Sequence, residues 1–252
     1  MPNYEQVNVD TQDGVTTITF NRPDKMNAIT PTMLGELNQA LDAAAADDSV
    51  SVVILTGAGR AFSAGLDLVA LGELKLDAGN VGGGLDGPAR NAIKTIESMP
   101  KPVIAKVNGF CFTGALEIAL SCDLFYAANE AKFGDTHTKW GLRPSWGMSQ
   151  RLPRAVGFRK ARELSFTAGT FTGTEAAEMG MANQAVPAAE LDQVVADVAA
   201  AIVPNSREAI AAYKGLYAAA ANNGLNDGIQ FEQNTKYTIS DTNNRLAEFA
   251  KK

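Results

Sequence analysis

The sequence has very few of the side chains that bind metal ions or form disulfides. Its 252 residues include one histidine, His137, and two cysteines, Cys111 and Cys122. The cysteines do not have CxxC spacing and both lie in a strongly apolar stretch. We therefore expect packed thiols in a reducing compartment. Zinc enzymes use several His, Cys or carboxylate ligands, so the shortage of such residues argues against a metal site.

The chain also lacks a basic surface and a long hydrophobic run. There are 28 acidic and 22 basic residues, for a net charge of −6, and no Lys/Arg-rich stripe is visible, which disfavours nucleic-acid binding. No apolar run reaches transmembrane length, and the polar start MPNYEQVNVD does not resemble a signal or transit peptide. We expect a cytoplasmic protein. Its hydrophobic content of 46% is sufficient for a sizeable core.

Apolar patterning predicts strands and helices that alternate along the chain. Strands are expected at 15–20 and 52–55, with a helix between them that Thr30 caps and Pro31 begins. This spacing indicates a parallel crossover unit. The glycine-rich segment 72–88 lacks the Gly-Lys-Ser/Thr of a phosphate-binding loop, so it is predicted to be a surface loop.

The remaining predicted elements follow the same two periodicities. Strands are expected at 103–107 and 184–186, and helices at 89–99, within 149–166, at 174–180 and at 191–202. From Ser206 the sequence is alanine-rich and predicted to be helical, with a break at the Asn-Asn-Gly of 222–224.

The strongest functional signal lies between Lys101 and Leu152. After the turn at Asn108-Gly109, Gly114 opens a helix that is apolar on every side apart from Glu117. A buried carboxylate is costly unless a partner or a reaction requires it, and no Lys or Arg occupies the neighbouring helical positions. Gly114 would let a ligand oxygen approach its amide. An amide donor and a buried acid within one turn suit enolate chemistry.

Five segments, in order along nearly the whole chain, resemble the crotonase (enoyl-CoA hydratase/isomerase) superfamily. They are RPDKMNAI (22–29), LTGAGRAFSAGLDL (55–68), VNGFCFTGALEIALSCDL (107–124), FGDTHTKWG (133–141) with SQRLPRAVG after it, and FTAGTFTGTEAAEMGMANQAV (166–186). No single segment decides the resemblance, but five in sequence do. Thr113 departs from the family's preference for Gly or Ala at that position.

The resemblance implies a fold, a reaction and an assembly. The fold would be α/β, with a spiral of β-β-α turns over residues 1–205 and a helical C-terminal arm over 206–252. In the family this arm packs on neighbouring subunits of a homotrimer, often paired into a homohexamer. The substrate would be an acyl-CoA thioester, with coenzyme A entering as part of the substrate and no separate cofactor or metal. The expected reaction is the syn addition of water to 2-enoyl-CoA.

The resemblance also implies site residues. The backbone N–H groups of Leu66 and Gly114 would form an oxyanion hole, and Glu117 matches the family's first catalytic glutamate. The residues expected to bind coenzyme A or the acyl thioester are Lys25, Ala64, Leu66, Asp67, Leu68 and Gly114. Val69 departs from relatives that have a lysine there.

His137 is the main departure from the hydratase pattern. Hydratases of the family have Phe-Gly-x-Pro-Glu, whereas this chain has Phe-Gly-Asp-Thr-His, so His137 occupies the position of the second catalytic glutamate. A Glu117–His137 pair suits hydration if Glu117 activates water and His137 steers it or protonates C2. Glu117 alone suits Δ3,Δ2-enoyl-CoA isomerisation, thioester hydrolysis or decarboxylation. Asp135 is an alternative acid if the loop shifts by two residues.

Other classes fit the sequence less well. A serine hydrolase built on Ser63, His137 and Asp123 lacks the first glycine of G-x-S-x-G. A non-catalytic, RNA-binding relative is disfavoured by the acidic charge. Trp140 and Trp146 flank the His137 loop, and they either form a wall of the acyl pocket or pack in the core.

Overall fold

The computed structural model describes residues 4–67, 79 and 82–251, and it has two sheets. The larger sheet has six strands in the order β1-β2-β3-β5-β7-β10. These strands are β1 Val7–Gln12, β2 Val15–Phe20, β3 Val52–Gly57, β5 Val103–Val107, β7 Leu124–Ala128 and β10 Gln184–Val186. β1 and β2 form an antiparallel hairpin, and the other neighbouring strands run parallel.

The smaller sheet repeats the connectivity of the larger one. Its strands are β4 Ala61–Ser63, β6 Phe110–Phe112, β8 Lys132–Gly134 and β9 Phe171–Thr172. β4, β6 and β8 are parallel, and β9 is antiparallel to β8. Each of β4, β6 and β8 follows a strand of the larger sheet after a short turn. The chain therefore winds through successive β-β-α units, which confirms the predicted spiral.

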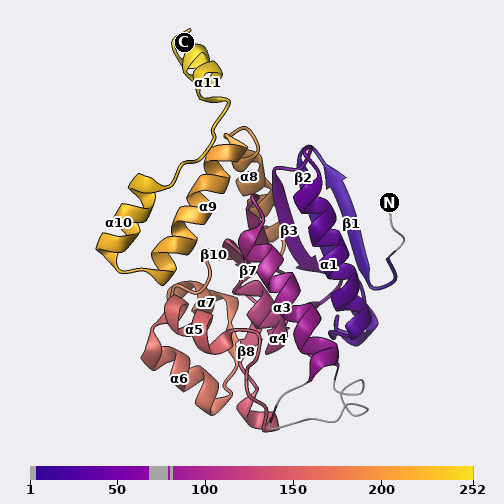
Figure 1. The fold of residues 1–252 in the computed structure, drawn as a ribbon. Helices are drawn as coiled ribbons and strands as arrows, with labels where there is room; N and C mark the ends of the chain where they lie inside the picture. The colour runs from indigo at the N-terminus through magenta and orange to yellow at the C-terminus, as the bar shows by residue number, and fades with distance from the viewer. Residues whose placement is uncertain (1–3, 68–78, 80–81, 252) are drawn as a thin grey trace.

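The helices up to α8 pack around the sheets, and the helices after α8 form the C-terminal arm (Figure 1). Those of the body are η1 Pro23–Lys25, α1 Pro31–Ala46, α3 Gly83–Ser98, α4 Gly114–Ala119, η2 Thr138–Trp140, α5 Met148–Val156, α6 Phe158–Thr167, α7 Gly173–Glu178 and α8 Leu191–Ile202. Three more follow, α9 Arg207–Asn222, α10 Leu225–Asn234 and α11 Thr242–Phe249. Among the described residues, no helix is long and apolar enough to cross a membrane.

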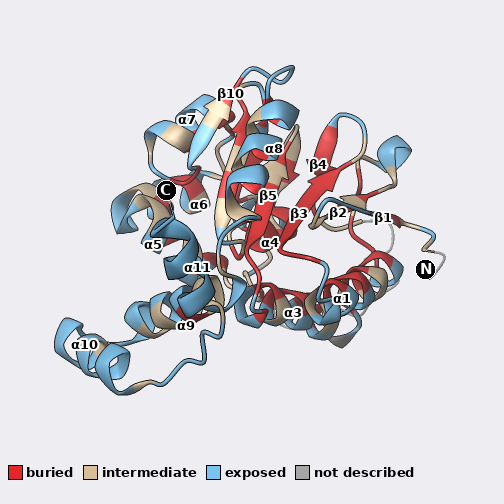
Figure 2. Cartoon of the chain, turned by 90° about the horizontal axis from the view of Figure 1, so that it is seen from above, coloured by how far each residue is buried: buried red, intermediate tan, exposed pale blue. Residues whose placement is uncertain are grey.

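The predicted crossover unit is present, and its first helix has the expected signals. The Thr30 side chain accepts the Met33 N–H at 3.1 Å, and Pro31 begins α1. The apolar stripe that includes Leu37 and Leu41 is buried. Burying such a side chain contributes about 1.5–3 kcal/mol. Figure 2 shows the buried inner sides of α1 and α3 beneath the sheets, with their outer sides exposed.

One predicted boundary is wrong. Residues 83–88 belong to α3, whereas the sequence analysis placed them in a surface loop and began the helix at 89. Their glycines favour a loop, but Leu85 is fully buried and the side chain of Asp86 binds Trp146 and Ser145. These contacts outweigh the low helix propensity of glycine. The remainder of the predicted loop, apart from 79 and 82, lies outside the described residues.

α4 lies at the centre of the molecule (Figure 2). All six of its residues are buried, including Glu117, as the absence of a polar face predicted. The other predicted helices and strands are present, and the break at 222–224 separates α9 from α10. Cys111 and Cys122 are free thiols, and burial raises the pKa of both.

The arm is attached to the body by a half-buried ion pair. Lys214 Nζ on α9 lies 2.7 Å from Asp123 Oδ2 and also donates to the carbonyl oxygens of Ile96 and Lys101. Burial raises the pKa of Asp123, although the charge of Lys214 opposes this. Figure 1 shows α9 beside the body while α10 and α11 extend beyond it.

Lys214→Met is expected to destabilise the protein by about 2–4 kcal/mol at pH 7, because it leaves the Asp123 charge without its cation. Loss of Lys214 raises the pKa of Asp123 further, and the folded state then favours the protonated acid. The deficit should therefore shrink as the pH is lowered. Urea unfolding at a fixed protein concentration measures both effects.

Lys160→Met is the matched control, since Lys160 and Glu163 form an exposed pair one turn apart on α6. It should change the free energy of unfolding by less than about 0.5 kcal/mol. Equal effects of the two substitutions would contradict a structural role for the Lys214 contact.

Candidate active site

The segment around Leu66 runs beside the segment that follows η1. The Ile29 N–H donates to the Gly65 carbonyl at 2.8 Å, and the Asp67 N–H donates to the Ile29 carbonyl at 3.0 Å. These bonds use the peptide groups on either side of Leu66. The Leu66 N–H is therefore directed away from Ile29, as expected for a bridge between parallel strands.

Gly65 packs directly against Thr113, which brings Leu66 close to the start of α4. A methyl group on Gly65, whose φ is +91°, would lie 2.4 Å from Thr113 Oγ1, so only glycine fits. Thr113 has a φ of +46° and a ψ of −114°, which is a strained conformation for a β-branched residue. Glycine would adopt this conformation at a lower energetic cost.

Gly114 begins α4 directly after this strained residue. The first hydrogen bond of the helix joins the Glu117 N–H to the Thr113 carbonyl at 3.0 Å. The N–H of Gly114 therefore lies in the first turn, where the helix supplies no acceptor. With the Gly65–Thr113 contact, this arrangement brings the amide groups of Leu66 and Gly114 into one region.

Glu117 projects from α4 into the interior and is 1% exposed. Its Oε1 accepts the N–H groups of Trp146, at 3.0 Å, and Met148, at 2.8 Å. Burial raises the pKa of Glu117, against the opposing effects of the Met148 N–H, the His137 charge and the Trp146 N–H. A raised pKa suits a carboxyl group that exchanges protons near neutral pH.

His137 faces the other oxygen of Glu117. It follows β8 in the chain and is 6% exposed, with Nε2 lying 3.6 Å from Glu117 Oε2. Its Nδ1 lies 2.6 Å from Asp135 Oδ1. Burial alone would lower the pKa of His137, but the Asp135 hydrogen bond and the charges of Glu117 and Asp135 outweigh it, so the pKa is raised. The two residues predicted to be catalytic are thus adjacent.

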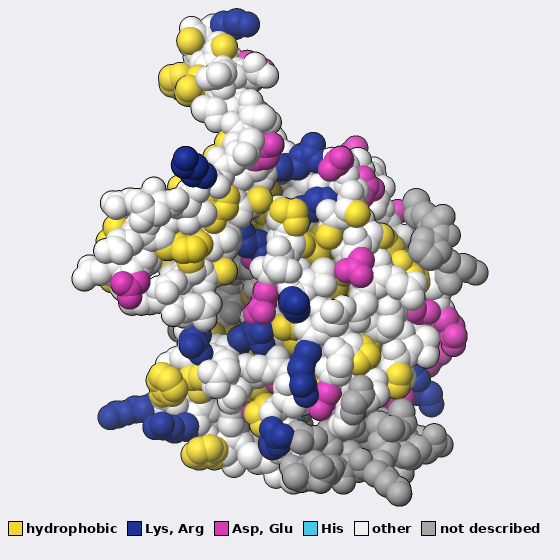
Figure 3. Space-filling model, in the orientation of Figure 1, with side chains coloured by type: hydrophobic (Ala, Val, Ile, Leu, Met, Phe, Trp, Pro, Cys, Tyr) yellow, Lys and Arg dark blue, Asp and Glu magenta, His cyan; other side chains and the backbone are white. Residues whose placement is uncertain are grey.

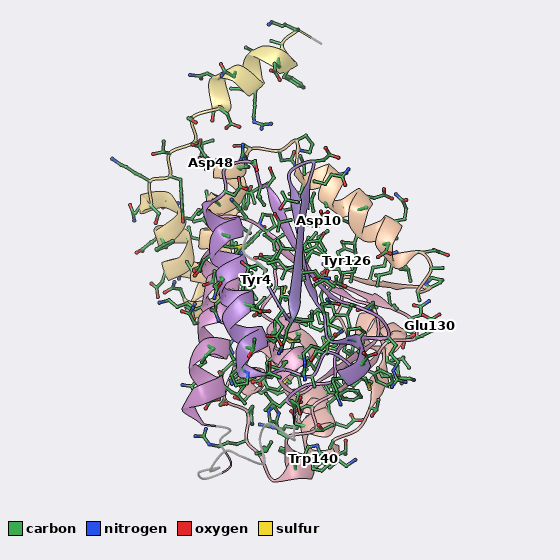
Figure 4. The ribbon with its side chains drawn as sticks, turned by 90° about the vertical axis from the view of Figure 1, so that its right-hand side faces the viewer. Tyr4, Asp10, Asp48, Tyr126, Glu130 and Trp140 are labelled. Carbon is green, nitrogen blue, oxygen red and sulfur yellow. The ribbon has the colours of Figure 1, made fainter. Side chains whose placement is uncertain are left out.

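The Trp146 indole fixes a further side of this region. A methyl group on Gly114 would lie 2.5 Å from the ring, so the indole packs directly against the helix start. Its Nε1 donates to Asp86 Oδ1 at 2.7 Å, and the Ser145 hydroxyl donates to the same oxygen at 2.7 Å. α3 therefore anchors the segment that supplies two N–H groups to Glu117. In contrast, Trp140 is 55% exposed, at the edge of the molecule in Figure 4.

The chain is similar to known proteins over most of its length. Residues 10–251 match the family described as Enoyl-CoA hydratase/isomerase. The chain belongs to this family. It is 35% identical over 226 residues to a probable peroxisomal enoyl-CoA hydratase 1 of Arabidopsis thaliana, covering 90% of this chain and 80% of the relative. It is also 35% identical over 227 residues to a crotonyl-CoA hydratase of Syntrophomonas wolfei, covering 90% and 85%.

The fold matches solved structures of the same family. The crystal structure of an enoyl-CoA hydratase from Bacillus anthracis superposes with a TM-score of 0.86 at 32% identity. The match covers 91% of this chain and 88% of that one. The resemblance inferred from the five sequence segments is confirmed.

Lys25, Ala64, Leu66 and Asp67, which are expected to bind coenzyme A, lie on two neighbouring segments of the chain. The Ala64 N–H donates to the Met26 carbonyl at 2.9 Å, which places Lys25, exposed at the end of η1, near Ala64. Asp67 forms an ion pair with Arg22 at 3.1 Å. The sequence analysis did not identify Arg22 as part of this region. Leu68, also expected at the site, lies outside the described residues.

The rival serine-hydrolase arrangement does not form. The Ser63 hydroxyl accepts the Gly65 N–H at 3.2 Å, and Asp123 pairs with Lys214. Asp135, considered as an alternative acid, hydrogen-bonds His137 and does not replace it. In the described part of the chain, no group of three His, Cys, Asp or Glu residues is placed to hold a metal ion.

Gly114→Ala is expected to destabilise the protein by about 1–3 kcal/mol, because the added methyl group would overlap the Trp146 ring. The displaced ring would also disturb the N–H bond to Glu117. Thermal and urea unfolding measure the loss. The control is Gly35→Ala in α1, where no atom lies within 4 Å of the added methyl group. It should stabilise the helix by about 1 kcal/mol, and a comparable loss there would contradict the steric explanation.

Proposed function

We propose that this protein is an enoyl-CoA hydratase that adds water across the double bond of a 2-enoyl-CoA thioester. The observation that carries the proposal is the 3.6 Å separation of Glu117 Oε2 and His137 Nε2 in a buried site beside Gly114. Relatives named as enoyl-CoA and crotonyl-CoA hydratases support it.

The proposed reaction needs one base, one acid and an oxyanion site. Ionised Glu117 takes a proton from water as the water oxygen bonds to C3. The C2=C3 electron pair moves into the thioester carbonyl, and the enolate oxygen is stabilised by the N–H groups of Leu66 and Gly114. Protonated His137 then gives its Nε2 proton to C2. Proton transfer from Glu117 to His137 restores the starting state. Oxyanion donors of this kind are worth about 10²–10³ in rate each.

Lys25, Ala64, Leu66 and Asp67 are proposed to bind the coenzyme A part of the substrate. Lys25 supplies an exposed cation for a phosphate, and the backbone of the other three offers polar groups to the adenine edge. The reaction requires no separate cofactor or metal. A cytoplasmic location stays a prediction from the sequence.

Glu117→Gln is expected to reduce kcat on crotonyl-CoA by about 10²–10⁴, because it retains the shape but removes the base. His137→Ala should give a similar loss, and the double variant should lose less than the product of the two factors. Absorbance of the conjugated enoyl thioester follows the reaction. Glu163→Gln, an exposed position on α6, is the control and should leave kcat unchanged.

The same assay separates the alternatives. Loss of absorbance from a 2-enoyl-CoA indicates hydration, gain of absorbance from a 3-enoyl-CoA indicates isomerisation, and free thiol indicates thioester hydrolysis. If His137→Ala retains activity within a few-fold of the parent, the pair does not act together. Single-base isomerisation by Glu117 then becomes the better description.

We further propose that residues 206–252 form an arm that packs on neighbouring subunits of a homotrimer or homohexamer. The arm carries many large apolar side chains exposed to solvent, and Figure 3 shows them on α11, which projects from the body, and over the α9–α10 region. They are Tyr213, Tyr217, Leu225, Ile229, Phe231, Tyr237, Ile239, Leu246 and Phe249. Exposed apolar surface of this extent is typical of an interface.

Light scattering is expected to give three or six times the 26.5 kDa mass of the chain. Replacing Leu246 and Phe249 of α11 with Asp should lower the measured mass, because both side chains are exposed in the single chain. Asn243→Asp adds one charge to the same helix without removing an apolar side chain, and it serves as the control. A parent protein that remains monomeric at micromolar concentration would refute the assembly.

A further inference from the structure

Asp135 is a buried carboxylate whose two oxygens are both engaged. It is 3% exposed, its Oδ1 lies 2.6 Å from His137 Nδ1, and its Oδ2 accepts the hydroxyl of Ser165 at 2.6 Å. Ser165 belongs to α6, which comes from a later part of the chain. A line of polar contacts therefore runs from α6 through Asp135 and His137 to Glu117.

These contacts determine which ring nitrogen of His137 carries the hydrogen and which one faces Glu117. An ionised carboxylate only accepts hydrogen bonds, so the Nδ1 atom carries the hydrogen in the contact with Asp135. The hydrogen bonds from His137 and Ser165 hold the pKa of Asp135 below its usual range despite its burial. With Nδ1 engaged, Nε2 is the atom presented to Glu117. A neighbouring group that sets tautomer and orientation in this way is a common feature of catalytic histidines.

The charges around the ring favour the imidazolium. Asp135 on the His137 loop and Glu117 on α4 are the charged groups that act on it, and both are acidic. Burial without such partners would favour the neutral ring, and a neutral ring with its hydrogen on Nδ1 would have no proton to donate at Nε2. The two carboxylates beside His137 therefore favour the charged form of the ring, in which Nε2 carries a proton.

We propose that Asp135 and Ser165 are positioning residues that set the tautomer and the charge of His137, so that an imidazolium does the work of the second catalytic glutamate. Asp135 acts on Nδ1, and Ser165 orients Asp135. This inference rests on the proposed hydratase function, but its first test does not use turnover.

Two variants distinguish an effect on His137 from simple anchoring of the loop to α6. α6 holds this loop at a second point, where the Thr138 hydroxyl donates to the Ser165 carbonyl at 2.7 Å. Thr138→Val removes that anchor without touching the Asp135 carboxylate. Asp135→Asn has nearly the same shape as the parent and can still accept from Nδ1, but it removes the charge.

The experiment is ¹⁵N NMR of the histidine ring in the ligand-free full-length protein, titrated with pH. His137 is the sole histidine of the chain, so every imidazole signal is its own. Asp135→Asn is expected to lower the pKa of His137 by about one unit or more, because an opposite charge next to a titrating group typically shifts it by that amount. Ser165→Ala should produce a smaller shift in the same direction, and Thr138→Val should leave the titration and the Nδ1–H tautomer unchanged.

Kinetics on crotonyl-CoA provide the second readout. Activity that needs protonated His137 falls as the pH rises through its pKa, so Asp135→Asn should move the alkaline limb of kcat/KM to lower pH. An unchanged titration of His137 in Asp135→Asn would overturn the inference, as would an equal shift in Thr138→Val. If the NMR shift appears but no enoyl-CoA is turned over, the positioning role stands and the hydratase proposal fails.

Discussion

Glu117 can remain inside the protein because groups from outside its own helix compensate for the hydration that it loses. α4 is apolar on every other side and supplies no partner. The compensation comes from the N–H groups of Trp146 and Met148 on one oxygen and from His137 near the other. An ionised carboxylate without them would cost several kcal/mol. The segments that provide these groups are therefore constrained by one buried side chain.

The spiral explains how these segments meet. Each β-β-α unit contributes one short strand to the smaller sheet, where β4, β6 and β8 are neighbours. The chain that leaves β4 carries Leu66, the chain that leaves β6 carries Gly114, and the chain that leaves β8 carries His137. Residues far apart in sequence thus meet because parallel strands end at the same edge. The contact between Gly65 and Thr113 holds the segments that follow β4 and β6 against each other.

The sequence was sufficient to predict the helices and strands whose signals lie within the element itself. The N-cap at Thr30 and the all-apolar helix around Glu117 were predicted because capping and periodicity act within one helix. The motif spacing also led to the prediction that His137 occupies the position of the family's second acid. Residues 83–88 were assigned wrongly, because Asp86 and its neighbours are held in α3 by contacts with a distant segment. No local pattern carries such information.

The same limit applies to the site itself. Nothing near Ser165 in the sequence indicates that its hydroxyl meets Asp135, since Asp135 lies 30 positions earlier, in the loop after β8. Asp135 lies two residues from His137, but spacing alone does not show whether its side chain faces the ring or the solvent. The charge and the tautomer of the His137 ring depend on its two acidic neighbours, Asp135 and Glu117. The contacts from Ser165 on α6 through Asp135 to His137 and Glu117 therefore bring together residues whose association depends on the tertiary fold.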